Sequence, residues 1–116
     1  MTVTPDPPAS EIPELTLPTP ITVVFAVLGR RWSLHVLYLL GQRPARFTEL
    51  QRAIPGISAN SLNERLRDLV GEGMVLRRAF PGPPMTSSYE TTPAGQAISE
   101  HLLRMAGAPI LTTPRP

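Results

Sequence analysis

The chain has 116 residues, of which 41% are apolar and 17% charged, and it carries a net charge of +2 and no cysteine. This length suits one domain, which argues against an enzyme whose active site lies between two domains. The absence of cysteine excludes disulfides, thiolate zinc sites and thiol redox sensing. The two histidines, His35 and His101, are far apart in the sequence, so we expect no metal site and no cofactor.

The charge is unevenly distributed along the chain. Residues 1–20 hold three acidic residues and no basic one, whereas residues 21–80 hold nine of the eleven basic residues against four acidic ones. Every basic residue is arginine, a side chain suited to bidentate contacts with phosphate or guanine. A genome with GC-rich codons would produce the same bias, so the positive middle of the chain indicates either a nucleic-acid partner or only a codon preference.

The first 20 residues contain six prolines and few bulky side chains, a composition that favours a flexible, acidic arm. Ile12, Leu15 and Leu17 in this arm could pack on a partner subunit. The arm lacks the positive start and apolar stretch of a secretory signal, and no apolar run reaches the roughly 20 residues needed to span a bilayer. We therefore expect a cytoplasmic protein without a membrane partner, folded over residues 21–107, with a tail over 108–116.

Three helices are predicted in the first half of this domain. Residues 22–28 favour a short helix, although their β-branched side chains also suit a strand. Residues 32–40 repeat apolar side chains at helical spacing, and Gly41 then supplies the left-handed residue that commonly ends a helix. Residues 47–54 form a third, short helix that stops at Pro55.

The clearest helix follows Ser58, because serine is a preferred N-cap. Leu62, Leu66, Leu69 and Val70 then recur at i, i+4, i+7 and i+8. This spacing predicts an amphipathic helix with these four residues in the core. The helix ends in the glycine-rich segment that follows.

A β-hairpin and a last helix complete the domain. Residues 74–80 and 87–91 are predicted strands, joined by a Pro-Gly-Pro-Pro turn at 81–84. Thr92 is the expected N-cap of a final helix that begins with Pro93. This order of elements predicts an α+β fold, mainly α: a winged helix-turn-helix with a two-stranded β-hairpin as its wing.

In such a fold the amphipathic helix enters the major groove, with its first residues nearest the bases. Its apolar stripe leaves Asn60, Glu64 and Arg67 on the opposite face, with Ser61 and Asp68 beside them. Asparagine can pair with adenine, glutamate with the cytosine amino group, and arginine with guanine or phosphate. An ordinary solvated helix face is the alternative for these side chains, and we prefer it for Asp68.

Further DNA contacts are expected around this helix. Arg65, at the margin of the apolar stripe, can reach a backbone phosphate and also tie the two helices of the motif together. Arg46 lies at the start of the third helix, and of the two arginines that lead into the hairpin only one can point outward, which we expect to be Arg78. The hairpin tip has no arginine, so the hydroxyls of Thr86 and Ser87 would make its minor-groove contacts.

The aromatic side chains predict a core and, as an alternative, a ligand pocket. Phe47, Trp32 and Tyr38 are expected mainly in the core. The apolar space between Phe25, Trp32, Tyr38 and Leu102 of the last helix could also hold a small apolar molecule. Pairs of a histidine with an acid or a serine can be drawn in the last third of the chain, but no spacing makes them converge, so we expect no enzyme.

Several segments resemble the HxlR-type winged helix-turn-helix transcription regulators. They are Arg-Phe-Thr-Glu-Leu at 46–50, Ile-Pro-Gly-Ile-Ser at 54–58, Leu-Asn-Glu-Arg-Leu-Arg-Asp-Leu at 62–69 and Gly-Arg-Arg-Trp-Ser at 29–33. The likeness covers residues 21–105. It implies flanking dimerisation helices, that is, a homodimer paired through its first and last helices, with two reading helices in successive major grooves of a palindromic operator.

The resemblance also implies a set of groove residues. By position these are Ser58, Asn60, Ser61, Asn63, Glu64 and Arg65. The chain departs from the family at three points. It reads Thr-Pro-Ile at 19–21, where members often have a sensing cysteine, asparagine at position 60, where lysine is common, and Ser-Ser-Tyr-Glu-Thr-Thr at 87–92 in the wing.

We therefore expect a sequence-specific transcription regulator that binds double-stranded DNA as a homodimer on a palindromic operator and responds, if it senses anything, to a small-molecule effector. The alternative is a winged-helix scaffold repurposed to bind or transform an apolar metabolite, with weak or no DNA binding. The lost lysine and the uncharged wing motivate this alternative, because both lower the positive charge available to phosphate.

Overall fold

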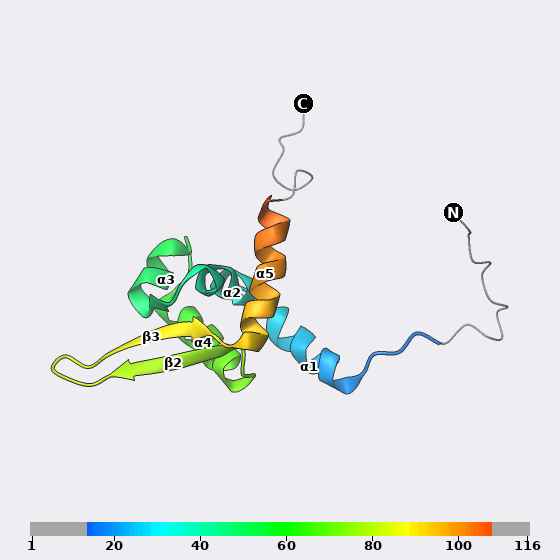
Figure 1. Cartoon of the computed structure of the whole chain (residues 1–116), viewed down its shortest axis with the longest axis horizontal. Coiled ribbons are helices and arrows are strands. Elements are labelled where there is room, and N and C mark those ends of the chain that lie inside the picture. Colours follow the sequence, from blue (N-terminus) through cyan, green and yellow to red (C-terminus); the bar gives the residue numbers. More distant parts are fainter. Residues whose placement is uncertain (1–13, 108–116) are drawn as a thin grey trace, which may run out of the picture.

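The computed structural model describes residues 14–107, and the expectations for residues 1–13 and 108–116 lie outside them. The described part forms a mainly helical winged helix-turn-helix, as the sequence predicts (Figure 1). In chain order the elements are α1 (Thr19–Leu28), α2 (Ser33–Gln42), β1 (Ala45–Arg46), α3 (Phe47–Ala53), α4 (Ala59–Gly71), β2 (Val75–Phe80), β3 (Thr86–Thr91) and α5 (Pro93–Gly107).

The first element settles an alternative that the sequence left open. It is a helix and not a strand, and it begins at Thr19 rather than at residue 22. Only Val27 of α1 is buried. No single helix in the described part of the chain is long and apolar enough to cross a membrane; α1 and α2 pass that test only when taken together, and a bend of 88° separates them.

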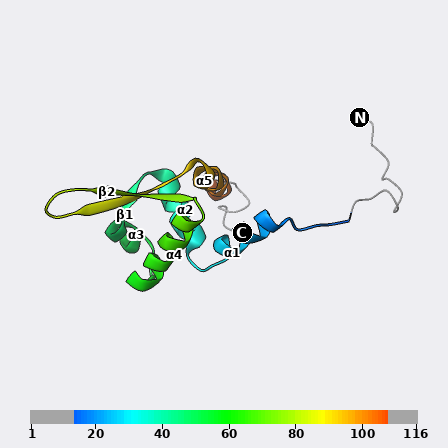
Figure 2. The ribbon, with the colours of Figure 1, turned by 90° about the horizontal axis from the view of Figure 1, so that it is seen from below.

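The sheet contains a strand that the sequence analysis missed. β1 pairs with β3, which gives the antiparallel order β1-β3-β2, with Ala45 opposite Tyr89. Two residues are too few to show the alternation by which a strand is recognised in a sequence. The hairpin of β2 and β3 projects away from the helices as the wing, in both orientations of the molecule (Figures 1 and 2).

The core lies between α2, α4 and the base of the sheet. Leu62, Leu66 and Leu69 of α4 are fully buried in it, as predicted. The prediction that Val70 joins them is wrong, because its side chain is 40% exposed. Val70 lies at the edge of the apolar stripe and lines an open groove between α4 and the wing.

Hydrogen bonds confirm the predicted starts of two helices. The Ser58 hydroxyl accepts a hydrogen bond from the Ser61 amide at 3.0 Å, and the Thr92 hydroxyl accepts one from the Gly95 amide at 3.2 Å. Each hydroxyl supplies an acceptor for a backbone amide in the first turn, where a helix offers no carbonyl partner.

The prediction that Gly41 ends its helix is wrong. α2 continues to Gln42, and Gly41 lies inside it, where α5 passes closely. A Cβ atom on Gly41 would lie 2.3 Å from the Cβ of the buried Ser99. The Ser99 hydroxyl donates a hydrogen bond to the Leu37 carbonyl at 2.7 Å. The contact between α2 and α5, and not the end of a helix, therefore requires a glycine at this position.

Candidate nucleic-acid interface

The reading helix α4 presents a polar face to solvent. Asn60, Asn63, Glu64 and Arg67 are exposed, and their spacing places them on one face, opposite the buried leucines. The structure therefore brings four of the predicted groove residues together on one surface. Ser58, which caps the helix, is also exposed but lies beside Ser61.

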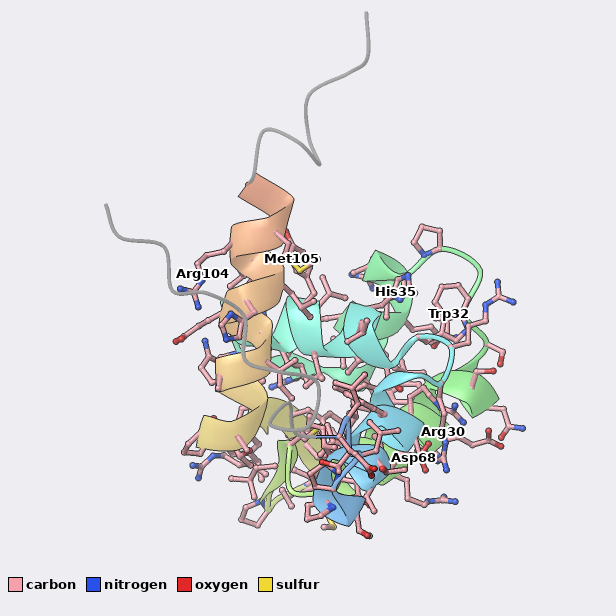
Figure 3. The ribbon with its side chains drawn as sticks, turned by 90° about the vertical axis from the view of Figure 1, so that its right-hand side faces the viewer. Arg30, Trp32, His35, Asp68, Arg104 and Met105 are labelled. Atoms are coloured by element: carbon pink, nitrogen blue, oxygen red, sulfur yellow. The ribbon has the colours of Figure 1, made fainter. Side chains whose placement is uncertain are left out.

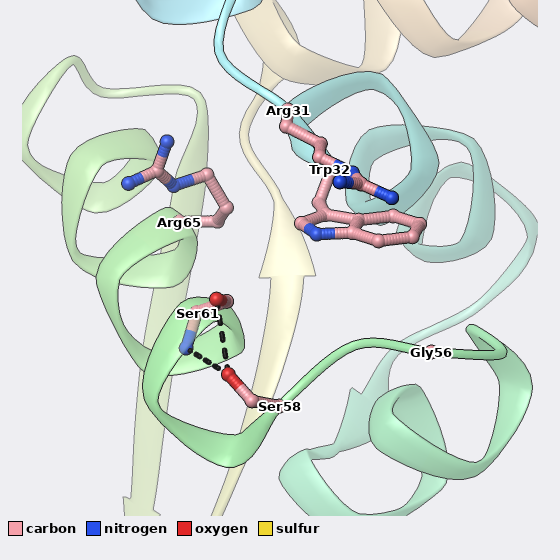
Figure 4. Close-up of a pocket in the computed structure, with 6 residues that line it drawn as sticks. All are labelled: Arg31, Trp32, Gly56, Ser58, Ser61 and Arg65. Carbon is pink, nitrogen blue, oxygen red and sulfur yellow. Dashed lines mark hydrogen bonds between the residues drawn. The ribbon is translucent and has the colours of Figure 1, made fainter.

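Two other predicted contacts, Ser61 and Arg65, lie on a different side of α4. They line a hollow of about 270 Å³ together with Arg31 and Trp32, which precede α2 (Figure 4). The guanidinium carbon of Arg31 lies 4.5 Å from the centre of the Trp32 ring. Ser61 and Arg65 are both partly buried, unlike the exposed residues of the reading face.

Asp68 is not the solvated surface residue that we expected. Its Oδ2 atom lies 2.7 Å from Nη1 of Arg30, in the loop after α1 (Figure 3). The hydrogen bond from Arg30 to this carboxylate, and the charge of the carboxylate, raise the pKa of Arg30 above its ordinary value. The Arg30–Asp68 pair therefore connects α4 to the loop between α1 and α2.

Arg65 does not tie the two helices of the motif together. Its guanidinium lies 3.3 Å from Glu64 and 3.4 Å from Asp68, and both acids belong to α4 itself. The side chain of Arg65 is only 17% exposed. Arg30 joins α4 to a different part of the fold, the loop between α1 and α2.

The wing places its two arginines on opposite faces of the sheet. Arg77 shares the face of Tyr89, towards α4, and with Arg67 it lines a groove of about 330 Å³. Arg78 lies on the outer face, where it pairs with Glu90. Both arginines are exposed, because the hairpin projects beyond the core. The expectation that only Arg78 points outward is therefore wrong.

The remaining predicted contacts lie on or beside the sheet. Arg46 is opposite Ser88 in the register, which places it on the same outer face as Arg78. Thr86 and Ser87 are half-buried at the start of β3. The structure therefore separates Arg46 and Arg78 from the groove that borders the reading face.

The four residues of the predicted ligand pocket do not line one cavity. Tyr38 and Leu102 line a mostly apolar hollow of about 300 Å³ between α2 and α5. Trp32 belongs to the hollow beside α4, and Phe25, which is half exposed on α1, lines neither of them.

Sequence reasoning did not single out Arg30, Arg31 or Arg77 for the site. The first two belong to the Gly-Arg-Arg-Trp-Ser segment, which we used only as a family motif. The two arginines before a tryptophan in this segment could have indicated a phosphate-binding loop, but the sequence does not show that this loop contacts α4. For Arg77, the alternation of side chains along a strand shows that Arg77 and Arg78 lie on opposite faces of the sheet. It does not show which of the two faces is turned towards α4.

The family model described as HxlR-like helix-turn-helix matches residues 27–108. The chain belongs to this family. HxlR-like relatives include the HTH-type transcriptional regulator YodB of Bacillus subtilis, 36% identical over 74 residues, which are 64% of this chain and 66% of YodB. Another is the uncharacterized HTH-type transcriptional regulator YtfH of Escherichia coli, 34% identical over 76 residues, which are 66% of this chain and 60% of YtfH.

Solved structures of other regulators share the fold. Reduced YodB from B. subtilis superimposes with a TM-score of 0.70 at 30% identity, covering 87% of this chain and all of that one. The oxidized form of the redox regulator HypR gives a TM-score of 0.71 at 25% identity, covering 83% and 99%. Both of these structures are named for a redox state, whereas these 116 residues contain no cysteine.

Proposed function

We propose that this chain is a sequence-specific, DNA-binding transcription regulator that acts as a cytoplasmic homodimer on a palindromic operator. The observation that carries the proposal is the exposed polar face of α4, which begins at a capped first turn. Family membership and the printed names of the relatives support it. Two such helices would enter successive major grooves, about 34 Å apart.

In the proposed complex the residues of the reading face and of the wing have different roles. Asn60 and Asn63 pair with base edges, and Glu64 accepts a hydrogen bond from a cytosine amino group. Arg67 and Arg77, on the two sides of the groove between α4 and the wing, hold the phosphate backbone. Arg77 therefore takes the place that we had expected for Arg78.

The proposed dimer pairs α1 and α5 of each protomer. Phe25 on α1 and Met105 on α5 are each 53% exposed, and Ile21 and Val23 add to the apolar surface of α1. Exposed apolar patches of this kind mark protein–protein interfaces. Pairing of these helices would cover the patch and hold the two copies of α4 at a fixed distance.

We also propose a binding role rather than catalysis, which the names of the relatives support. The apolar hollow of Tyr38 and Leu102 is the place for a small apolar effector. The same hollow favours the second candidate function, a metabolite-binding scaffold that has lost DNA binding. Candidate metabolites are tested for binding by whether they raise the melting temperature of the protein. If operator DNA then alters the affinity of the protein for such a metabolite, the result supports the effector. If the protein binds the metabolite but no DNA, the result supports the second candidate function.

The proposed regulator is tested with the DNA upstream of its own gene. The logarithm of the affinity should fall linearly with the logarithm of salt concentration, because each phosphate contact releases counterions. Arg77→Gln should weaken binding and lower the salt slope by about 1. Arg78→Gln, which removes the same charge from the neighbouring residue, should change neither, because Arg78 lies on the outer face of the sheet and does not line this groove.

Sequence reading is tested separately with Asn60→Ala. This variant should lose about 1–3 kcal/mol of preference for the operator over unrelated duplex, while its affinity for unrelated duplex stays the same. Binding that is insensitive to salt, or no binding to any duplex, would contradict the proposed function.

A further inference from the structure

A second polar surface lies beside α4, apart from its base-reading face. It is the hollow of about 270 Å³ formed where three segments of the chain meet: the residues before α2, the turn after α3 and the first turns of α4 (Figure 4). The residues that line it are Arg31, Trp32, Gly56, Ser58, Ser61 and Arg65.

The backbone holds Arg31 and Trp32 in a particular arrangement at this hollow. Trp32 has a φ of 78°, a left-handed conformation that costs a non-glycine residue on the order of 1–3 kcal/mol and persists only where the surroundings impose it. Hydrogen bonds from the Ser33 amide to the Arg30 carbonyl and from the Val36 amide to the Trp32 carbonyl fix the turn on both sides. The turn places the Arg31 guanidinium over the Trp32 ring.

No ion pair neutralises Arg31 within the described part of the chain. Among residues 14–107 no acidic side chain pairs with it, and the residue is exposed. The other cation of the hollow, Arg65, is paired with Glu64 and Asp68. Stacking on Trp32 leaves the N–H groups at the edge of the guanidinium available to a ligand.

A hydroxyl donor completes the hollow. The Ser58 hydroxyl donates a hydrogen bond to the Ser61 hydroxyl at 3.0 Å and also accepts one from the Ser61 amide. The proton of the Ser61 hydroxyl is therefore left to donate to a ligand. An unpaired guanidinium and a hydroxyl donor facing one hollow fit an oxyanion.

We infer that this hollow binds one phosphate group, held by the Arg31 guanidinium and the Ser61 hydroxyl. The inference rests on the proposed function for its natural source, a phosphate of the DNA backbone beside the groove that α4 enters. A free metabolite that carries a phosphate offers the same chemistry, and the two sources are distinguished by experiment. Arg31 would then position the helix on DNA without reading its sequence.

Trp32 is the chain's single tryptophan, so its fluorescence reports on this hollow directly. The full chain is titrated with a short duplex DNA of unrelated sequence and, separately, with sodium pyrophosphate. Wild-type fluorescence should change with the duplex. Arg31→Gln should abolish the change, lower the salt slope by about 1 and weaken duplex affinity about eightfold at 0.1 M salt.

Two further variants separate charge at the hollow from net charge and from folding. Arg43→Gln removes an equal charge at the opposite end of α2 and should leave the fluorescence change in place. Arg31→Lys should keep the salt slope of the wild type, because lysine retains the positive charge. A purely structural role of Arg31 would not predict this result.

The outcomes distinguish this inference from the proposed function. If wild-type protein binds the duplex, and Arg31→Gln has the same affinity and salt slope, the inference is wrong and the proposed function stands. If only pyrophosphate changes the fluorescence, and Arg31→Gln abolishes that change, the phosphate site stands with a free ligand and the proposed function fails. If neither duplex nor pyrophosphate has an effect, both fail.

Discussion

The helices in the middle of the chain and those at its ends bury their apolar side chains to very different extents. Val36 of α2 and Leu62 of α4 are completely buried, and each of these helices contributes several such side chains to the core. In contrast, α1 buries only Val27, and the residues that α5 buries are the small Gly95 and Ser99.

This difference indicates which part of the fold is complete in one chain. The middle helices gain the free energy of apolar burial, about 25 cal/mol per Å² of apolar surface, from contacts within the protomer. The half-exposed Phe25 and Met105 would gain most of their burial free energy only by contact with a second protomer. The middle region therefore accounts for folding of the protomer, and the end helices for the proposed assembly.

The largest expected effect is on the buried stripe of α4. Leu66→Ala should lower the free energy of unfolding by about 2–5 kcal/mol, because it leaves a cavity in a closely packed core. The matched change Leu76→Ala, at a residue 43% exposed on the wing, should cost less than about 1 kcal/mol. Denaturant unfolding measures both, and equal losses would break the proposed contrast between core and surface.

A second substitution tests how α5 joins the middle region. Gly95→Ala should cost about 1–3 kcal/mol, because its Cβ would lie 1.9 Å from the Met74 carbonyl oxygen. Gly71→Ala is the control, since nothing lies within 4 Å of its Cβ, and it should be neutral or slightly stabilising. An unchanged stability for Gly95→Ala would mean that α5 is held only by the partner.

The end helices are tested by association rather than by folding. Phe25→Glu should raise the dissociation constant of the dimer at least about tenfold, or about 1.4 kcal/mol, because a charge would have to be buried between α1 and α5 of the two protomers. Sedimentation over a range of concentrations measures it. Phe80→Glu, at a similarly exposed position on the wing, should leave the dimer intact. Dissociation by both variants would place the interface elsewhere.

The smallest effect concerns pH and the exposed surface of the middle region. A hydrogen bond from Arg43, at 2.7 Å, and one from the Arg46 amide, at 3.0 Å, lower the pKa of Glu49 below its ordinary 4.5. Because its pKa is lower in the folded protein, the ionised Glu49 carboxylate stabilises the fold. This contribution to the free energy of unfolding is complete above pH 4.5 and is lost as the pH falls through the pKa of the folded state. When the pH is lowered from 7, the melting temperature of the wild type should therefore fall slightly more than that of Glu49→Gln.

The middle region is also the part that the sequence predicts best. The serine cap and the leucine spacing of α4 are local signals, so this helix and its exposed face were found in advance. Gly41 was misinterpreted because its close neighbour, Ser99, is distant in the sequence. β1 was missed because two residues carry no periodicity.

The errors at the site have the same origin. Asp68 faces Arg30, and Arg77 faces α4, because of how a loop and a hairpin pack against that helix. Helical and strand periodicity gives the face on which a side chain lies but does not identify the neighbouring element. The predictions were therefore correct about the exposure of Asn60, Asn63, Glu64 and Arg67 and wrong about the neighbours of Arg65, Asp68 and Arg77.

The close contact at Gly41 has a consequence for the geometry of an assembled pair. Because α5 touches the backbone of α2 and Ser99 is bonded to the Leu37 carbonyl, sliding of α5 along α2 would break that bond and force atoms together. α2 and α5 should therefore turn as one body. In a dimer joined through α5, a few degrees of tilt at the junction would be carried to both copies of α4, and would change the operator spacing that they can span.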